Sequence, residues 1–213
     1  MKKMMILCGG GHAKCVIDAI QLGGKYSPCC VLDLKERVGK KVLGIKITGS
    51  DSELAAHYRQ GIKLCFLALG STGDPSRRIA LWKQAVKVGF DLPAIIHPSA
   101  VVSAHAEIGR GVYVGPSAII NAGAFIGEGC IINSGAIVEH DCRIGAFVHI
   151  APGAVLSGGV IVGDRAHLGT GCSVMHGISI GADSIIGVGS AVVKDVPART
   201  VAFGNPAKKI KSR

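Results

Sequence analysis

The chain has 213 residues, of which 48% are apolar, 31 are glycine and only 4% are aromatic. This length accommodates two small domains, and the composition suits a fold that packs small aliphatic side chains around frequent tight turns. The formal net charge of +10 attracts anions in general, but the scarcity of aromatic rings argues against a nucleic-acid surface built on base stacking.

The N-terminal residues have a charged tip, but their apolar run is too short for a signal peptide. No stretch approaches the roughly 18 apolar residues of a membrane span, so a cytoplasmic protein is expected. The eight cysteines form no CxxC pair with metal-ligand spacing. Reduced thiols and no metal site are therefore predicted.

Residues 1–97 alternate between strand and helix patterns, which predicts an α/β, Rossmann-like domain. Strands are expected near residues 4–8, 29–33, 64–69 and 94–96, and helices near residues 13–22, 52–58 and 76–88.

A glycine loop (residues 9–12, Gly-Gly-Gly-His) lies where the first strand meets the first helix. Backbone N–H groups in such a loop approach a phosphate closely, and the helix dipole favours its negative charge. Lys14 occupies the place of the third glycine of the dinucleotide fingerprint. Asp33, at the end of the second strand, stands where an acidic side chain can hydrogen-bond a ribose or base. The alternative to a ligand site is a tight turn followed by a solvated acidic side chain.

A six-residue repeat governs the second half of the chain. From Val102 to Val192 every sixth residue is valine, isoleucine or leucine, at sixteen consecutive positions. A second series, two residues earlier, holds only small or aliphatic residues from Ala100 to Ser190. Residues two apart in a strand share one face, so each hexad is a short strand with one large and one small inward side chain, followed by a turn.

Three such hexads close one coil of a parallel β-helix, in which residues 18 apart stack about 4.8 Å from each other. Residues 98–193 are therefore expected to form an all-β domain of about five coils, with Ile132, Ile150 and Leu168 stacked on one interior edge. Residues 194–213 form a C-terminal extension. A structural β-solenoid without chemistry is the alternative, and the singular histidines of the repeat argue against it.

The positions just before the large inward residues include several apolar side chains: Ile119, Phe125, Ile131 and Ile137. These outward residues predict a local apolar patch whose exposure to water is unfavourable. A homotrimer with its β-helices side by side would cover the patch and create a cleft between subunits.

His140 is the candidate base within the repeat. It follows the inward Val138 by two residues, which puts it at a corner with its imidazole outside the core. Gly158 lies 18 residues further on, so its backbone is expected to stack beside His140. This arrangement suits acyl transfer, because a near-neutral base takes a proton from an attacking amine while a backbone N–H stabilises the oxyanion. Direct transfer is expected, since no activated serine or cysteine stands out.

Six segments resemble known proteins when they are taken together: Gly9-Gly10-Gly11-His12, Leu43-Gly44, Leu69-Gly70, His97-Pro98-Ser99-Ala100, Val138-Glu139-His140-Asp141 and Gly204-Asn205-Pro206-Ala207-Lys208. Over nearly its whole length the chain resembles the hexapeptide-repeat sugar acetyltransferases of the sialic acid O-acetyltransferase family. It is most similar to the UDP-4-amino-sugar N-acetyltransferases of bacillosamine synthesis. The resemblance implies a left-handed β-helix, with acetyl-CoA bound along it between two subunits.

The resemblance also implies residue roles. His140 would be the general base, Asp141 would orient it, and Gly158 would bind the acetyl oxygen. His149, Thr170 and Val188 would contact acetyl-CoA, although the family usually has glycine at the position of Val188. From the residues themselves, the strand, glycine turn and helix start predict a site for a nucleotide-linked amino-dideoxysugar, with Gly10, Gly11 and His12 near phosphate and Asp33 near the ribose or base. Gly70 is the fifth residue expected at this site.

Several alternatives stay open at this stage. The acceptor is expected to be a UDP-linked 4-amino-4,6-dideoxysugar, but GDP-perosamine and free sialic acid, with O-acetylation, also fit the pattern. A non-catalytic nucleotide-sugar-binding protein is the alternative of another class. His149 and His167 are 18 residues apart, as on the zinc-binding surfaces of β-helical carbonic anhydrases, but the closely spaced histidine pair of those enzymes is missing.

Overall fold

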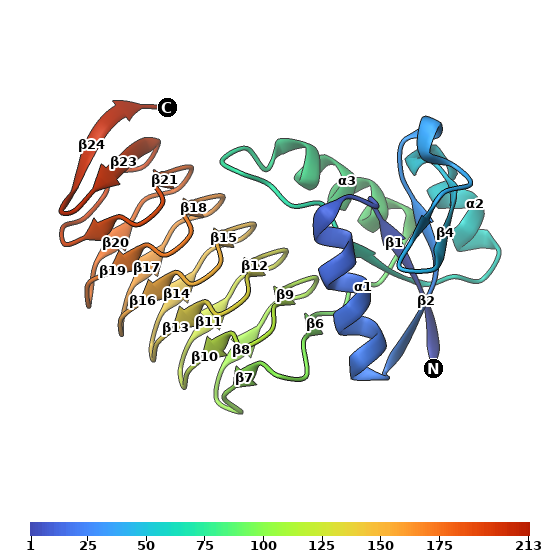
Figure 1. Cartoon of the computed structure of the whole chain (residues 1–213), viewed down its shortest axis with the longest axis horizontal. Coiled ribbons are helices and arrows are strands. Elements are labelled where there is room, and N and C mark those ends of the chain that lie inside the picture. Colours follow the sequence, from blue (N-terminus) through green and yellow to red (C-terminus); the bar gives the residue numbers. More distant parts are fainter. The chain divides into compact units, whose positions relative to one another are not determined.

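The computed structural model describes residues 1–213 and divides the chain into two compact units (Figure 1). The first unit contains Met1–Ser71 and Ser76–Pro98, and the second contains Thr72–Pro75 and Ser99–Arg213. No helix in either unit has both the length and the apolar character needed to cross a membrane.

The first unit is built on a five-stranded sheet with the order β3-β4-β2-β1-β5. Its strands are β1 (Lys2–Leu7), β2 (Tyr26–Leu32), β3 (Lys41–Val42), β4 (Ile45–Gly49) and β5 (Leu64–Leu67). The pairs β1–β2, β1–β5 and β2–β4 are parallel, whereas β3–β4 is antiparallel. The central strand β1 is buried from Met4 to Leu7, as expected for a strand covered on both faces.

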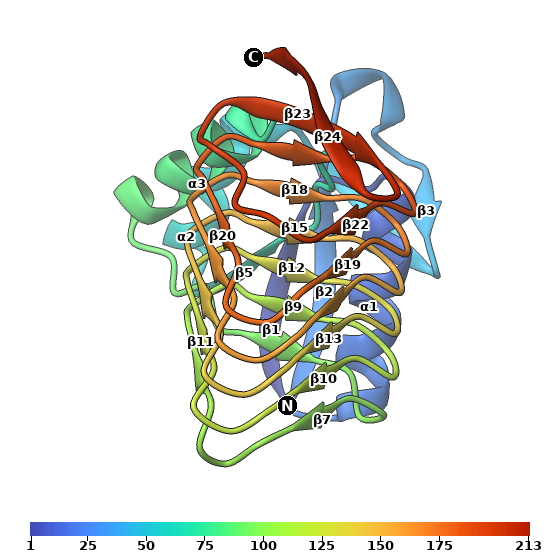
Figure 2. The ribbon, with the colours of Figure 1, turned by 90° about the vertical axis from the view of Figure 1, so that its left-hand side faces the viewer.

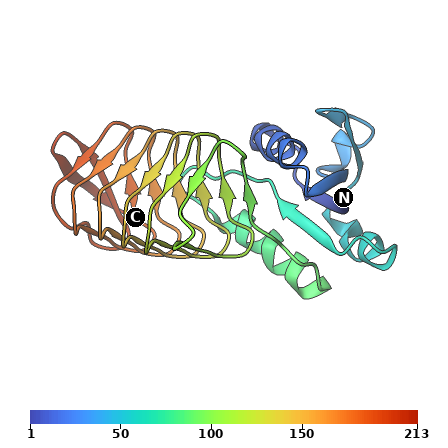
Figure 3. The ribbon, with the colours of Figure 1, turned by 90° about the horizontal axis from the view of Figure 1, so that it is seen from below.

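Helices cover both faces of this sheet. Figure 3 shows α1 (Gly11–Gly23) on one side and α2 (Leu54–Arg59) and α3 (Ser76–Val88) on the other. The unit also contains the short 3₁₀ turns η1 (Lys35–Arg37) and η2 (Asp51–Glu53), and the two-residue strand β6 (Ile95–Ile96). Helix α1 buries its apolar residues at helical spacing: Ala13, Val16, Ile17 and Ile20.

The predicted α/β domain is confirmed, with one element missing from the prediction. The hairpin of β3 and β4 was not expected, because its two-residue turn carries Leu43 rather than the usual asparagine or aspartate before Gly44. Both residues have positive φ, 45° for Leu43 and 83° for Gly44. This is the backbone of a tight hairpin turn, which glycine adopts freely and leucine does not.

The second unit is a left-handed parallel β-helix with three faces, each a stack of parallel strands (Figure 2). The first face consists of β7 (Val101–Val102), β10 (Ile119–Ile120), β13 (Ile137–Val138), β16 (Val155–Leu156), β19 (Ser173–Val174) and β22 (Ala191–Val192). The second face consists of β8 (Glu107–Ile108), β11 (Phe125–Ile126), β14 (Arg143–Ile144), β17 (Ile161–Val162) and β20 (Ser179–Ile180). The third face includes β9 (Tyr113–Val114), β12 (Ile131–Ile132), β15 (His149–Ile150), β18 (His167–Leu168) and β21 (Ile185–Ile186).

The β-helix interior follows the two predicted inward series. Ile132 pairs with Ile150, Ile150 pairs with Leu168, and all three side chains are fully buried. The smaller series is also buried from Val112 to Ser190. The predicted stack is therefore confirmed.

The chain closes the β-helix with a hairpin. Strand β23 (Thr200–Gly204) pairs in parallel with β21, and β24 (Ala207–Ser212) returns antiparallel to β23. The six-residue period ends before this segment, so the sequence pattern did not indicate these two strands.

The predicted apolar patch of Ile119, Phe125, Ile131 and Ile137 is wrong. Ile119 and Ile137 are partners on the first face, but Phe125 lies on the second face and Ile131 on the third. Ile131 is also only 3% exposed. Residues six apart fall on successive faces of a three-sided coil, and only residues 18 apart stack.

An apolar column does exist on the first face. It joins outward residues 18 apart: Val101, Ile119, Ile137 and Val155. None of these four side chains is fully buried, and Val101 is 62% exposed.

Candidate functional site

His140 and Asp141 form the turn between β13 on the first face and β14 on the second. The His140 Nδ1 and an Asp141 carboxylate oxygen are 2.8 Å apart. A carboxylate only accepts hydrogen bonds, so in the neutral imidazole Nδ1 carries the proton and Nε2 has the lone pair. Both side chains are exposed, at 56% for His140 and 73% for Asp141. The pair is therefore an oriented imidazole that is exposed at the surface of this chain.

The local backbone favours this orientation. Asp141 has a φ of 61°, a left-handed conformation that aspartate tolerates better than most residues. A Cβ atom on Gly123, one coil away, would lie 2.5 Å from an Asp141 carboxylate oxygen. Gly123 therefore leaves the space that the Asp141 carboxylate occupies.

The imidazole of His140 lies directly over the backbone of Gly158. A Cβ atom on Gly158 would come within 2.5 Å of both Cε1 and Nε2 of His140. The N–H of Gly159 donates to the His140 carbonyl at 2.9 Å, which keeps the two coils in register. The Gly158 N–H makes no hydrogen bond within the chain. The imidazole of His140 and an unpaired backbone donor thus lie side by side, as the 18-residue spacing predicted.

The same corner position holds His176 one coil beyond Gly158, and its ring centroid is 6.5 Å from that of His140. His176 is exposed. The corner therefore presents two imidazoles with a glycine between them.

The residues expected to contact acetyl-CoA are not together in one chain. Thr170 and Val188 occupy the corner between the third and first faces, where the Gly189 N–H donates to the Thr170 carbonyl at 2.9 Å. His149 lies outward on the third face. Gly158 lies at the other end of the first face. Within one chain these residues therefore form three separate groups.

On the third face, His149 and His167 stack as the sequence spacing predicted. Their ring centroids are 5.0 Å apart, and an Asn133 side-chain nitrogen lies 3.2 Å from Nε2 of His149. His167 is 9% exposed, and burial, followed by the charge of Arg213, lowers its pKa below the ordinary value. No group of three or more histidine, cysteine or acidic side chains is arranged to hold a metal ion.

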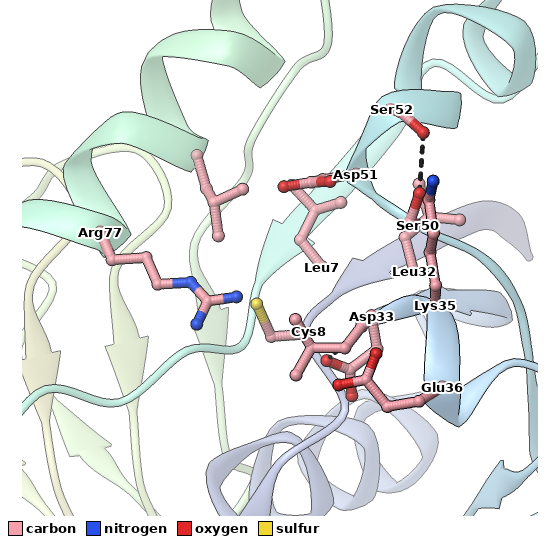
Figure 4. A pocket seen from close by; sticks show the side chains of 12 residues that line it. Leu7, Cys8, Leu32, Asp33, Lys35, Glu36, Ser50, Asp51, Ser52 and Arg77 are labelled. Atoms are coloured by element: carbon pink, nitrogen blue, oxygen red, sulfur yellow. Dashed lines mark hydrogen bonds between the residues drawn. The ribbon is translucent and has the colours of Figure 1, made fainter.

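In the first unit, a cavity of about 300 Å³ opens at the carboxyl ends of β1 and β2 (Figure 4). This is the edge of a parallel sheet at which α/β folds bind ligands. The cavity is lined by carboxylates of Asp33, Glu36 and Asp51 and by cations of Lys35 and Arg77. Carboxylates accept hydrogen bonds from hydroxyl and amine groups, and the cations attract phosphate.

Asp33 also organises the glycine loop. Its carboxylate accepts hydrogen bonds from the Gly9 N–H at 3.1 Å and the Leu34 N–H at 2.9 Å. It is paired with Arg37, whose second guanidinium nitrogen donates to the Gly9 carbonyl at 2.9 Å. Most of the acceptor capacity of Asp33 is therefore used inside the protein.

The other expected contacts of the nucleotide-linked sugar lie at the start of α1. Gly10 is the N-cap of this helix, Gly11 is its first residue and His12 its second. A Cβ atom on Gly70 would lie 3.6 Å from the Cβ of His12, so these two residues are neighbours. A Cβ atom on Gly10 or Gly11 would meet no atom within 4 Å outside the neighbouring backbone, so there is open space beside the start of the helix.

Sequence reasoning missed several lining residues of the cavity. Cys8, Ser50, Asp51 and Arg77 come from three separate segments. Only Ser50 had a detectable signal, because Glu53 follows it by three residues and accepts from the Ser50 N–H at 3.2 Å, as in a capping box. Burial, and then the charge of Asp33, raises the pKa of Cys8 to about 11, so this thiol stays protonated.

A β-helix of hexapeptide repeats with an oriented histidine over an unpaired glycine N–H defines the class of hexapeptide-repeat acyltransferases. Family comparisons agree. Residues 3–83 match the PglD N-terminal domain, and residues 123–158 match the bacterial transferase hexapeptide (six repeats). No curated protein sequence matches the chain significantly.

Three solved structures illustrate the similarity. A mutant of perosamine N-acetyltransferase from Caulobacter crescentus, in complex with CoA and GDP-perosamine, is 41% identical with a TM-score of 0.93, over 100% of this chain and 98% of that one. The acetyltransferase domain of PglB from Neisseria gonorrhoeae, in complex with acetyl coenzyme A, is 33% identical with a TM-score of 0.90, over 98% and 99%. WeeI from Acinetobacter baumannii is 25% identical with a TM-score of 0.85, over 99% and 100%. The chain belongs to this family of two-domain sugar N-acetyltransferases, which confirms the resemblance seen in the sequence.

Proposed function

We propose that this enzyme transfers the acetyl group of acetyl-CoA to the amine of a nucleotide-linked amino sugar, with His140 as general base. The observation that carries the proposal is the His140–Asp141 pair stacked on Gly158. Nε2 of His140 takes a proton from the sugar amine while the amine nitrogen attacks the thioester carbonyl carbon. The carbon–sulfur bond then breaks, and the proton returns to the CoA thiolate. Asp141 stabilises the imidazolium formed in between.

Gly158 supplies the electrostatic part of the mechanism. The attack converts the thioester carbonyl into an oxyanion, which a preorganised backbone N–H stabilises. The Gly158 N–H suits this role because it has no other acceptor and adjoins the base. An oxyanion-hole donor contributes about 10²–10³-fold in rate.

The acceptor binds in the first unit. The cavity beside Asp33 combines carboxylates for ribose or base with Arg77 and Lys35 for phosphate. The start of α1, at Gly11 and His12, adds the positive end of a helix dipole. Sequence reasoning favoured a UDP-linked sugar. The Caulobacter crescentus enzyme, 41% identical, was crystallised with GDP-perosamine, so a GDP-linked 4-amino sugar becomes the first candidate.

Acetyl-CoA binds between subunits of a homotrimer. In one chain Gly158, His149 and the Thr170–Val188 corner are on different sides of the β-helix, so one groove that includes all of them requires a second copy. The apolar column of Val101, Ile119, Ile137 and Val155 offers the surface for that copy. Light scattering of the purified chain should give three times the monomer mass, whereas a monomer at micromolar concentration would exclude a shared site.

The test of the function is an acetyl-transfer assay with GDP-, UDP- and dTDP-linked 4-amino sugars and free sialic acid, comparing wild type with His140→Ala. Loss of a general base costs about 10²–10⁴-fold in turnover, whereas acetyl-CoA affinity should hardly change. Acetylation of free sialic acid in preference to every nucleotide-linked amine would contradict the proposed acceptor. A His140→Ala variant that keeps more than about a tenth of wild-type turnover would contradict the proposed base.

A further inference from the structure

A pair of neighbouring thiols, Cys29 and Cys30, lies in the middle of β2. The strands β1 and β2 run in register until Met4 pairs with Pro28, and the next partner of β1 is Cys30 rather than Cys29. Cys29 is therefore the extra residue of a β-bulge. Successive side chains of a regular strand point to opposite faces, but a bulge redirects them. As a result the two sulfur atoms lie only 3.9 Å apart.

The two thiols differ in environment. Cys30 is 4% exposed, whereas Cys29 is partly exposed. The Cys29 thiol donates to the Met4 carbonyl at 3.4 Å. Cys29 is thus the more accessible of the two residues, and Cys30 is its buried neighbour.

A cavity of about 460 Å³ lies over the pair, which is room enough for a small peptide-sized molecule. Its lining includes Lys3 from β1 and His57 and Gln60 from the region of α2, and no acidic side chain. An anionic molecule can therefore approach Cys29 without like-charge repulsion, and Lys3 attracts it.

We propose that Cys29 and Cys30 form a thiol-modification site at which Cys29 reacts with low-molecular-weight disulfides and Cys30 serves as hydrogen-bond donor to the attacking sulfur. The Cys29 thiolate attacks one sulfur of the disulfide R–S–S–R, and a Cys29–S–S–R bond forms. The R–S–S–R bond breaks at the same time, and RS⁻ leaves and takes up a proton from water. The reagent itself is the oxidant, so no further electron acceptor is needed.

The electrostatics support this division of roles. The hydrogen bond from Cys30 and the charge of Lys3 lower the pKa of Cys29 to about 7, against the opposing effect of burial. The same hydrogen bond and burial raise the pKa of Cys30. His57 is the other titratable group that lines the cavity. Cys29 therefore carries thiolate near neutral pH while Cys30 stays a thiol.

The expected rate advantage follows from the thiolate fraction. A fall in pKa from 9.0 to about 7 increases the thiolate fraction at pH 6 by about ninetyfold. The lower intrinsic nucleophilicity of a less basic thiolate reduces this gain by about eightfold. Cys29 should therefore react about tenfold faster at pH 6 than an ordinary thiol of equal exposure.

The experiment uses the whole chain with oxidised glutathione at pH 6, followed by peptide mapping of the mixed disulfide. Cys29 should be the first residue modified in wild type, ahead of the exposed Cys15. First modification at Cys15 or any other cysteine would overturn the proposal, and this measurement needs no variant.

Variants then test the role of Cys30 in a Cys15→Ser background. Cys30→Ala removes the donor and should slow the reaction at pH 6 by about tenfold, while Cys30→Ser keeps an O–H donor and should retain the fast rate. Cys65→Ala, which removes a fully buried thiol elsewhere in the sheet, is the matched control and should leave the rate unchanged. Equal rates for Cys30→Ala and Cys30→Ser would overturn the role of Cys30.

Discussion

Gly158→Ala offers a sharp test of the catalytic geometry, because it adds one methyl group between the two proposed catalytic elements. The corresponding positions one coil away on either side hold His140 and His176, and Ala122 lies one coil beyond His140. Gly158 is also absent from the residues with positive φ. The backbone of this corner therefore accepts a side chain, and the absence of one at Gly158 serves the imidazole above it.

The magnitude follows from the contact distances. The new Cβ would lie 2.5 Å from two ring atoms of His140, whereas ordinary contacts begin near 3.4 Å, so the ring must move by about 1 Å. A misplacement of about 1 Å at a reacting group costs on the order of 10²-fold, which corresponds to about 2.7 kcal/mol in the activation free energy. We expect kcat/KM to fall by this factor, with little change in the melting temperature.

The assay follows acetylated sugar by chromatography, since the eight cysteines of the chain interfere with thiol reagents. His140→Ala and the double variant complete a mutant cycle. Once the imidazole is absent, the added methyl group has nothing to displace, so the double variant should be about as active as His140→Ala. A Gly158→Ala enzyme with more than about a third of wild-type kcat/KM, or losses that add in the double variant, would refute the stacked arrangement as the catalytic one.

Three further outcomes are expected. Arg37→Met should weaken nucleotide-sugar binding about tenfold in calorimetry without altering acetyl-CoA binding, because it removes the hydrogen bond that holds the Gly9 carbonyl. If the variant and the wild type bind the nucleotide sugar equally well, Arg37 does not position the glycine loop. Because burial lowers the pKa of His167, the unfolded chain binds its proton more tightly than the native protein. The free energy of unfolding should therefore decrease as the pH falls below about 6.5, and thermal melts of His167→Leu should show a smaller decrease. If the variant loses as much stability with falling pH as the wild type does, His167 is not the source of the pH dependence. Ile150→Ala should reduce the free energy of unfolding by about 2–5 kcal/mol. Val188 is 65% exposed, so Val188→Ala should change it by no more than about 0.5 kcal/mol. Similar melting temperatures for the two variants would contradict the assignment of Ile150 to the core.

Local spacing was enough to predict the β-helix and the stacking of His140 on Gly158. The two-residue side-chain period of the strands and the turn every six residues together fix which residues stack on one another. The pairing of Ile132 with Ile150 and of His140 with Gly158 therefore follows from their spacing of 18 residues. The glycine loop before α1 was equally visible, since the signal lies within a few consecutive residues.

Features that depend on contacts between distant segments could not be read in this way. The apolar patch was an error of another kind, because a coil of three hexads already implies that Phe125 and Ile131 lie on other faces than Ile119. The carboxylate of Asp33 was expected to bind a ligand, but Gly9 and Arg37 already contact it at the end of the sheet. The thiols of Cys29 and Cys30 meet because β1 and β2 shift register by one residue. In the first unit, hydrogen-bond partners and strand register are settled by packing between segments, which no local period encodes.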